Sequence, residues 1–353
     1  MNMGIIRQTP RALRGERTFP LNAALALAVG SCLLPASGVA ADRFCSTTTN
    51  AVFQACQNAG EEDYLIALGK CINVSDKDER RACLREAGTA RGDALRACRA
   101  QMRSRNRICR ALGEARYEPN TDPALFDSDF RNLPNPNRYF PLKVGNKWEF
   151  GGAESVVVEV LDKTKLIEGV TCAVVNDRVM VGGEVLEDTD DWFAQAKNGD
   201  VYCFGEAVKE YESFDGDSPR EPELLAIDGS FKTGREGDKP GFAFLSAPKP
   251  GQVYRQEYSL NNAEDIAEIV STTYTFGQDA ELDRLVPRAL AELLCAGDCV
   301  VTKEYQPLRP GVFERKFYAP GIGGFLVIHL DSAEVVQLVG CNFDSRCAAL
   351  PTP

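Results

Sequence analysis

Histidine is almost absent from this chain of 353 residues, and its scarcity excludes several kinds of active site. The single histidine, His329, lies in the segment GGFLVIHLDS. A Ser–His–Asp triad would have to use it, and no Gly-x-Ser-x-Gly segment supplies a nucleophilic serine. A histidine-based zinc site would lack partner ligands. We therefore predict a structural role for His329.

Several cofactor motifs are also missing. The chain has no Cys-x-x-Cys-His segment for haem attachment and no Asp-x-Asp-x-Asp-Gly loop for calcium. Gly321, Gly323 and Gly324 follow Pro320 and precede a strand-like run, whereas a phosphate-binding glycine loop opens a helix. These absences predict no cofactor, no metal centre and no assignable catalytic residue.

Long apolar runs are confined to the start of the chain. Four arginines precede the apolar run from Leu21 to Leu34, and the small residues 38–41 follow it. This order predicts a secretory signal peptide over residues 1–41, and hence a secreted or periplasmic protein. A lipid anchor on Cys32, within VGSC, is the alternative. No later run is long and apolar enough to predict a transmembrane segment.

Positive charge is scarce in most of the molecule. The formal net charge is −11, with +4 in residues 42–117 and −18 in residues 118–353. Nucleic-acid binding requires a basic footprint, so we exclude nucleic acid as a partner of the acidic part. An acidic composition favours solubility and attracts cations weakly.

Cysteine, by contrast, is abundant, and six of the 13 cysteines fall in residues 42–117. They are Cys45, Cys56, Cys71, Cys83, Cys98 and Cys109. Separations of 11 or 12 residues, close to three helical turns, recur between them. Zinc sites favour closer cysteine pairs, and this segment has no histidine. The pattern therefore predicts three disulfides.

Residues 42–117 are rich in helix-forming Ala, Leu, Arg and Glu. We expect three or four short antiparallel helices, with a capping box after Ser75 and helix ends at Gly60, Gly88 and Gly113. Large apolar residues are few, so disulfides worth about 2–4 kcal/mol each would compensate for a thin core.

Five arginines near the end of this segment share one helix face, because they are spaced by three or four residues. They are Arg96, Arg99, Arg103, Arg107 and Arg110. The face could dock an acidic partner, including the protein's own acidic part. A solvated face is the alternative, and we favour it.

The remainder of the chain predicts an antiparallel β domain. A proline-rich linker over residues 118–138 precedes short runs of Val, Thr, Tyr and Phe, separated by glycine turns, over residues 139–340. So many strands would form a barrel or a two-layer sheet. Residues 278–295 could include a short helix near Pro287. The fold class is thus α+β in two parts, with a disulfide-closed tail over residues 341–353.

Six cysteines belong to this acidic part and allow 15 pairings. They are Cys172, Cys203, Cys295, Cys299, Cys341 and Cys347. We expect the bond within the C-terminal loop first and the bond within the Cys-x3-Cys segment second. Cys172 and Cys203 would then bridge two strands. The Cys-x3-Cys spacing differs from that of redox-active pairs, so a redox role is disfavoured.

Several segments between residues 138 and 330 together resemble a family of exported bacterial proteins without an assigned function. These are RYFPLKVGNKWEF, VLDKTKLIEGVTCAVV, EDTDDWFAQAKNGDVYCFGE, YRQEY with AEDIAEI, and VTKEYQPLRPGVFERKFYAPGIGG. The resemblance implies export and a β architecture, and it supplies no catalytic residues. The six-cysteine helical segment lies outside it.

The segment DTDDWFAQAKNGDVYCFGE holds our candidate site. Asn198-Gly199 between two aromatic runs predicts a hairpin with a two-residue turn, which places Asp191 opposite Glu206. Like charges directly across a ladder are unfavourable. Arginine or lysine, a bound cation, a shared proton or water should therefore offset the repulsion.

In this register, aromatic rings accompany the two carboxylates on one face and would form the wall of a pocket. The candidate ligand-binding residues are Asp190, Asp191, Trp192, Phe193, Tyr202, Phe204 and Glu206. A neutralised hairpin face, a ligand or cation pocket, and a catalytic carboxylate pair remain the three interpretations.

The leading functional hypothesis is an exported, non-catalytic binding or structural protein of the cell envelope, holding a small apolar ligand or a cation in its β domain. The alternative is a carboxylate-dependent hydrolase. A hydrolase should show a deep cleft with at least one carboxyl group of raised pKa. A binding protein should show an apolar cavity without such a pair.

Overall fold

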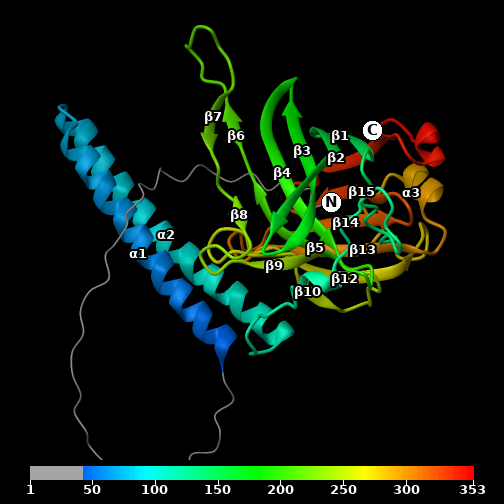
Figure 1. Ribbon diagram of the computed structural model, residues 1–353. Helices are drawn as coiled ribbons and strands as arrows, with labels where there is room; N and C mark the ends of the chain where they lie inside the picture. The colour runs from blue at the N-terminus through cyan, green and yellow to red at the C-terminus, as the bar shows by residue number, and fades with distance from the viewer. Residues whose placement is uncertain (1–42) are drawn as a thin grey trace, which may run out of the picture.

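The computed structural model describes residues 43–353, which form a helical hairpin followed by a nearly closed antiparallel β barrel (Figure 1). Helices α1 (Phe44–Ile72) and α2 (Lys77–Leu112) lie antiparallel, and the end of the hairpin where they are joined projects away from the barrel. The predicted fold class is confirmed. The predicted signal peptide and Cys32 lie outside the described residues.

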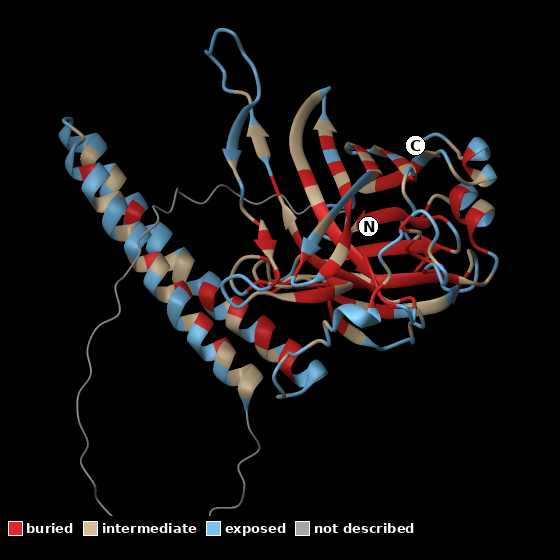
Figure 2. Ribbon diagram, in the orientation of Figure 1, coloured by how far each residue is buried: buried red, intermediate tan, exposed pale blue. Residues whose placement is uncertain are grey.

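Three disulfides cross-link the two helices. They join Cys45 to Cys109, Cys56 to Cys98, and Cys71 to Cys83. The prediction of three bonds among these six cysteines is therefore confirmed. Few other side chains of the hairpin are buried, as the predominance of pale blue and tan over the projecting end shows (Figure 2).

The prediction of three or four short helices is wrong, because Gly60 and Gly88 lie inside long helices. A Cβ added at Gly60 would lie 3.2 Å from the Cβ of Ala94, so this glycine permits close helix packing. The break between the helices falls at residues 73–76, where Asp76 caps α2 by accepting hydrogen bonds from the amides of the next turn. Gly113 ends α2 as predicted.

Sixteen strands follow the hairpin. The first eight are β1 (Lys147–Gly152), β2 (Ser155–Ile167), β3 (Val170–Val181), β4 (Glu184–Gln195), β5 (Val201–Ala207), β6 (Glu210–Glu212), β7 (Glu223–Ala226) and β8 (Phe231–Lys232). The others are β9 (Lys239–Phe244), β10 (Val253–Arg255), β11 (Glu257–Tyr258), β12 (Ile266–Tyr274), β13 (Cys299–Tyr305), β14 (Glu314–Ala319), β15 (Gly323–His329) and β16 (Val335–Cys341). The predicted short helix near Pro287 is α3 (Arg288–Leu294).

One continuous segment of chain brings the two edges of the sheet together. The strand order runs from β10 through β12 to β16, then β1 to β5, and ends at β9 and β11. Strands β10 and β11 are separated only by Gln256, so the same segment pairs with β12 on one side and with β9 on the other. A Cβ at Gly241 of β9 would lie 2.0 Å from the carbonyl oxygen of Gln256, so only glycine fits here.

Two apolar clusters flank strands β3, β4 and β5. The larger one fills the barrel and includes Phe193 and Cys203. The smaller one lies on the opposite face of these strands and includes Cys172 and Trp192. Phe126 of the predicted linker covers the smaller cluster and forms a β-bridge with Ala196.

This arrangement contradicts the predicted Cys172–Cys203 disulfide. Both thiols are free and buried, and they belong to clusters on opposite faces of the sheet. Side chains on opposite faces point apart and cannot meet without movement of the backbone. The bonds within the Cys-x3-Cys segment and the C-terminal loop are confirmed, as Cys295–Cys299 and Cys341–Cys347.

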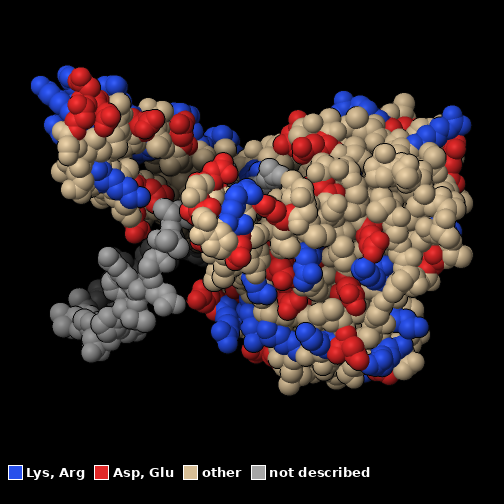
Figure 3. Space-filling view, turned by 90° about the horizontal axis from the view of Figure 1, so that it is seen from above, with Lys and Arg blue, Asp and Glu red and all other residues tan. Residues whose placement is uncertain are grey.

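The hairpin docks on the barrel through the second half of α2. Arg105 forms an ion pair with Glu264, with both residues buried. The Gln101 side chain donates a hydrogen bond to the Leu308 carbonyl. None of the five arginines predicted to share a face makes this contact, because all of them are exposed. Basic and acidic side chains are interspersed over the hairpin surface (Figure 3). Within residues 43–353, no helix is apolar and long enough to cross a membrane.

Candidate functional site

The β4–β5 hairpin positions the predicted pair as expected, with Asp191 directly opposite Glu206. The turn differs from the prediction, because the Ala196 amide bonds to the Asp200 carbonyl and three residues form the loop. Gly199 has φ +90°, as three-residue hairpin loops require at their last position. A second irregularity, between Asp191 and Phe193, compensates for the extra loop residue and restores the predicted pairing.

Between these two irregularities the register is shifted, so the predicted aromatic wall is not formed. Phe193 pairs with Cys203 and points into the barrel. Trp192, Tyr202 and Phe204 lie on the other face, packed with Phe126. The rings and the two carboxyl groups are therefore not neighbours in one pocket.

Asp190 is also separated from the pair. It accepts a hydrogen bond of 3.1 Å from the Asn176 amide, and Lys165 lies over the neighbouring Trp192 ring at 3.2 Å from its centroid. Of the seven predicted ligand-binding residues, the structure brings only Asp191 and Glu206 into a common pocket.

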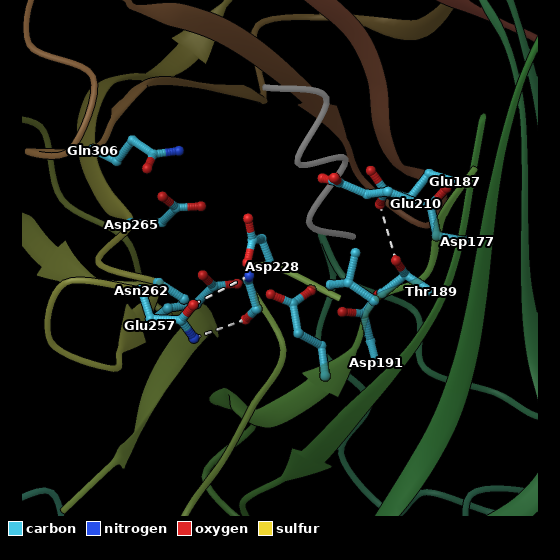
Figure 4. Close-up of a pocket in the computed structure, with 14 residues that line it drawn as sticks. Asp177, Glu187, Thr189, Asp191, Glu210, Asp228, Glu257, Asn262, Asp265 and Gln306 are labelled. Carbon is cyan, nitrogen blue, oxygen red and sulfur yellow. Dashed lines mark hydrogen bonds between the residues drawn. The ribbon is translucent and has the colours of Figure 1, made fainter. Parts of the chain in front are cut away.

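That pocket is strongly acidic. Its wall includes eight carboxyl groups, from segments widely separated in the sequence. They are those of Asp177, Glu187, Asp191, Glu206, Glu210, Asp228, Glu257 and Asp265. Figure 4 shows Asp177 and Glu187 on one side of the space and Asp265 on the other. Among the described residues, no lysine or arginine lines the pocket.

Burial opposes ionisation of these acids. Asp177 is only 6 % exposed, and burial, together with the charges of Asp191 and Glu187, holds its pKa well above the usual range. Burial raises the pKa of Asp191 to about 8, assisted by Glu187 and Asp190. Burial also raises the pKa of Glu206 well above its usual value, and the charges of Glu257 and Asp191 contribute.

Asp191 and Glu206 are cross-strand partners that line the same pocket. Burial raises the pKa of both carboxyl groups, so their neutral, protonated forms are favoured. A neutral partner removes the like-charge repulsion predicted for this cross-strand pair. Among the offsets considered from the sequence, protonation is therefore the one that the burial of the pair supports.

Two further acids of the pocket also have raised pKa values. Burial raises the pKa of Glu210 to about 7, with further contributions from Glu187 and Asp228. Burial also raises the pKa of Asp265 to about 7, although the nearby Lys316 ammonium acts in the opposite direction. The pocket therefore changes its charge near neutral pH.

Among the residues that the structure describes, one buried polar side-chain atom of the pocket has no hydrogen-bond partner. It is the Oδ1 atom of Asp177. Thr189 donates instead to Glu187, at 2.9 Å, and the Asn262 amide donates to the carbonyls of Gly229 and Ser230. Buried polar atoms are nearly always hydrogen bonded, so this one requires an explanation.

The acidic pocket lies near a buried ionic network inside the barrel. The Lys316 ammonium lies 2.9 Å from a Glu304 oxygen and 3.2 Å from a Glu314 oxygen. Tyr318 and Thr302 each donate to the other Glu304 oxygen at 2.8 Å. Although burial disfavours its charge, Glu304 keeps a pKa below the usual value because of Lys316 and these donors. Lys316 is therefore paired with two acids outside the pocket, and its charge also lowers the pKa of Asp265 in the pocket wall.

His329 lies at the edge of this network. Its Nδ1 atom is 3.5 Å from a carboxylate oxygen of Glu314. It is on the strand β15, and none of the pocket-lining residues is a histidine.

Three of the pocket acids follow a local pattern in the sequence that our prediction did not include. Glu187, Thr189 and Asp191 alternate along β4 and therefore share a face, and Asp177 is the cross-strand partner of Thr189. The acids from residues 210–265 have no such local signal, because the closure of the sheet alone brings them to the pocket.

The free space between the acids has a volume of about 60 Å³. Within the part of the chain that the structure describes, no three His, Cys, Asp or Glu side chains are arranged to hold a metal ion. The carboxyl groups are thus dispersed around a small space and do not converge on a single point.

Comparison of the chain with protein-family models, with curated proteins and with solved structures found no match.

Proposed function

We propose that this protein is an exported, non-catalytic binding protein that takes a cationic nitrogen group, an ammonium or a guanidinium, into the acidic pocket. The observation that carries the proposal is the buried Oδ1 of Asp177, which has no hydrogen-bond partner among residues 43–353, in a pocket that no described lysine or arginine lines. A buried acceptor without a donor costs about 1–3 kcal/mol, and a cationic donor would recover that free energy.

The arrangement of acceptors favours an organic cation over a metal ion. An ammonium group donates up to three hydrogen bonds in different directions, and a guanidinium donates five. Such groups match carboxyl groups distributed around a small space, whereas calcium requires six to eight converging oxygens at short distance. The rest of the ligand would remain at the mouth of the pocket.

Export is supported by three observations. Five disulfides join described cysteines, and such bonds persist in oxidising compartments. The first 41 residues have the order of a signal peptide, and residues 138–330 resemble a family of exported proteins. We propose a secreted or periplasmic location, with lipidation of Cys32 as the alternative.

Calorimetric titration with three ligands of matched length tests the proposed function. We expect 1,4-diaminobutane and n-butylamine to bind, and 1-butanol not to bind at concentrations up to about 10 mM. Affinity should rise from about pH 6 to about pH 9, because the amines remain charged while the carboxyl groups lose protons. Equal binding of amine and alcohol, or an affinity that falls over this range, would refute the proposal.

Two variants test whether the amine binds in the acidic pocket. Asp177→Asn removes the unpaired acceptor charge and should weaken amine binding about tenfold or more. Asp162→Asn is the matched control, because Asp162 is exposed on β2 and does not line the pocket. Unchanged affinity in Asp177→Asn would place the amine elsewhere.

The buried cross-strand pair of Asp191 and Glu206, in which both carboxyl groups have raised pKa values, favours a second candidate function, a carboxylate-dependent hydrolase. One carboxyl group of such a pair donates a proton to the leaving group while the other acts as base or nucleophile. Release of reducing ends from glycans measures this activity. The hydrolase requires that Asp191→Asn and Glu206→Gln each abolish turnover, and absence of turnover in the parent protein would exclude it for glycans.

A further inference from the structure

A second pocket, of opposite charge, lies between the helical hairpin and the barrel. It is lined by the start of α1, the end of α2 and the following segment on one side, and by residues of β9 to β11 and their loops on the other. Its cavity volume is about 320 Å³, within the range of small-molecule sites. Neither the predicted site nor the acidic pocket includes these residues.

Positive charge dominates this pocket even though the chain as a whole is acidic. Four basic side chains line it, those of Arg105, Arg116, Lys239 and Arg255, and Glu264 is the one carboxylate among the described lining residues. The local excess of positive charge favours an anionic ligand.

Arg105 lines this pocket and has a nitrogen from which no described residue accepts a hydrogen bond. Its Nη2 atom lies 2.6 Å from one Glu264 oxygen and its Nε atom 3.0 Å from the other. The third nitrogen, Nη1, is buried and has no hydrogen-bond partner within residues 43–353, in a residue that is 4 % exposed. Glu264 also accepts a hydrogen bond from the backbone amide of Asn261, at 2.7 Å.

Arg255 lies against two aromatic rings and is not paired with an acid. Its guanidinium carbon is 5.0 Å from the Tyr258 ring centroid and 5.5 Å from that of Tyr117. The closest hydrogen-bond contact of its Nη2 is the Cys45 sulfur, at 4.0 Å. Among the described residues, no carboxylate lies within ion-pair distance of Arg255, which is 9 % exposed, and burial lowers its pKa.

Aromatic rings form part of the same wall. The rings of Tyr117 and Tyr258 are in contact, with centroids 4.9 Å apart, and the Arg116 guanidinium lies 3.7 Å from the centroid of Phe44. A planar apolar body could pack between these rings, while its acidic group accepts hydrogen bonds from the arginines.

We propose that this pocket binds a small aromatic carboxylate, whose charged end pairs with Arg255 and the free nitrogen of Arg105. Arginine is suited to this role because it donates two parallel hydrogen bonds to a carboxylate. Because both parts of the protein contribute to the wall, the bound ligand would also hold the hairpin against the barrel.

Three probes with one ring system and different charges test this inference. They are 2-naphthoate, 2-naphthamide and 2-naphthylmethylamine, titrated by calorimetry. We expect the naphthoate to bind about tenfold or more tightly than the amide, and the amine not to displace bound naphthoate. Affinity for naphthoate should fall with added salt. This result is independent of the acidic pocket, which would select the opposite charge.

Variants show whether the ligand occupies this pocket. Arg255→Gln should weaken naphthoate binding about tenfold or more, and Arg116→Gln by a smaller factor. Arg99→Gln is the matched control, because Arg99 is exposed on α2 and does not line the pocket. If Arg255→Gln does not fold, the exposed Arg116 still provides the test.

Three outcomes would overturn the inference. One is that the amide binds as tightly as the naphthoate, and another is that neither binds at up to about 5 mM. The third is that naphthoate binds Arg255→Gln and Arg116→Gln as tightly as it binds the parent protein.

Discussion

The helical hairpin and the β barrel are stabilised in different ways, although one chain forms both. In the hairpin, four of the seven buried apolar residues within residues 43–112 are cysteines, and all four are disulfide bonded. In the barrel, large side chains such as Trp148, Phe193 and Phe317 are fully buried, whereas Cys172 and Cys203 remain free thiols.

The difference shows what disulfides contribute here. A hairpin of two helices exposes most of its surface and cannot bury enough apolar area to offset the entropy of ordering its chain. Covalent links reduce the entropy of its unfolded state. The barrel obtains its stability from burial, and its two disulfides close only short loops.

The largest effect should come from removal of the hairpin disulfides, which tests whether they stabilise the hairpin alone. With six cysteines of residues 42–117 replaced by serine, we expect a loss of about 6 kcal/mol or more in local stability, at 2–4 kcal/mol for each bond. Amide hydrogen exchange should then become rapid in α1 and α2 and stay slow in β13 to β16. Loss of protection in both regions would show that the barrel depends on the hairpin.

The second largest effect should come from the buried network in the barrel. Lys316→Met leaves Glu304 and Glu314 buried without their cation, which costs about 3–5 kcal/mol. Urea unfolding followed by tryptophan fluorescence measures the loss. Lys143→Met, at an exposed position, should change stability by less than about 0.5 kcal/mol. A comparable loss of stability in both variants would show that Lys316 in the buried network contributes no more than an exposed lysine.

Replacement of glycine by alanine should lower the stability of the barrel at one position and raise the stability of the hairpin at another. Gly241→Ala places a Cβ 2.0 Å from the Gln256 carbonyl oxygen and should destabilise the barrel by about 1–3 kcal/mol. Gly88→Ala meets open space on α2 and should stabilise the hairpin by about 0.5–1 kcal/mol. Thermal unfolding of each variant measures both, and a stabilising Gly241→Ala would disprove the tight closure at Gln256.

The smallest effect concerns the pH dependence of the barrel. The folded pKa of Asp191, about 8, lies above its ordinary value of 3.8, so its contribution to stability is complete at low pH and is lost as pH rises toward 8. Asp191→Asn should therefore be more stable than the parent above about pH 8, by about 1 kcal/mol or more, and unfold at a higher temperature. At about pH 4 the two proteins should be similar. A variant that is less stable at high pH would show that the charged form is the stabilised one.

Part of the candidate site could be predicted from sequence. The turn Asn198-Gly199 predicted the β4–β5 hairpin, and the pairing of Asp191 with Glu206 was correct. The prediction of an aromatic wall was wrong, because the hairpin loop contains three residues and ends at Gly199, which shifts the strand register by one residue. A second irregularity restores the predicted register only at Asp191. A shift of one residue moves every intervening side chain to the other face, and sequence alternation alone does not reveal a bulge.

The sequence by itself determined the features that depend on local spacing: cross-linked helices, an acidic β meander, the short-loop disulfides and the cross-strand acid pair. Only the tertiary structure decided which face of the sheet each cysteine occupies, and that Asp177, Glu210 and Asp265 meet Asp191 in one pocket. It also decided that Arg105, and not the exposed arginine face, joins the two regions. The physical reason is that closure of the sheet brings together residues remote in the chain, and no local pattern records such contacts.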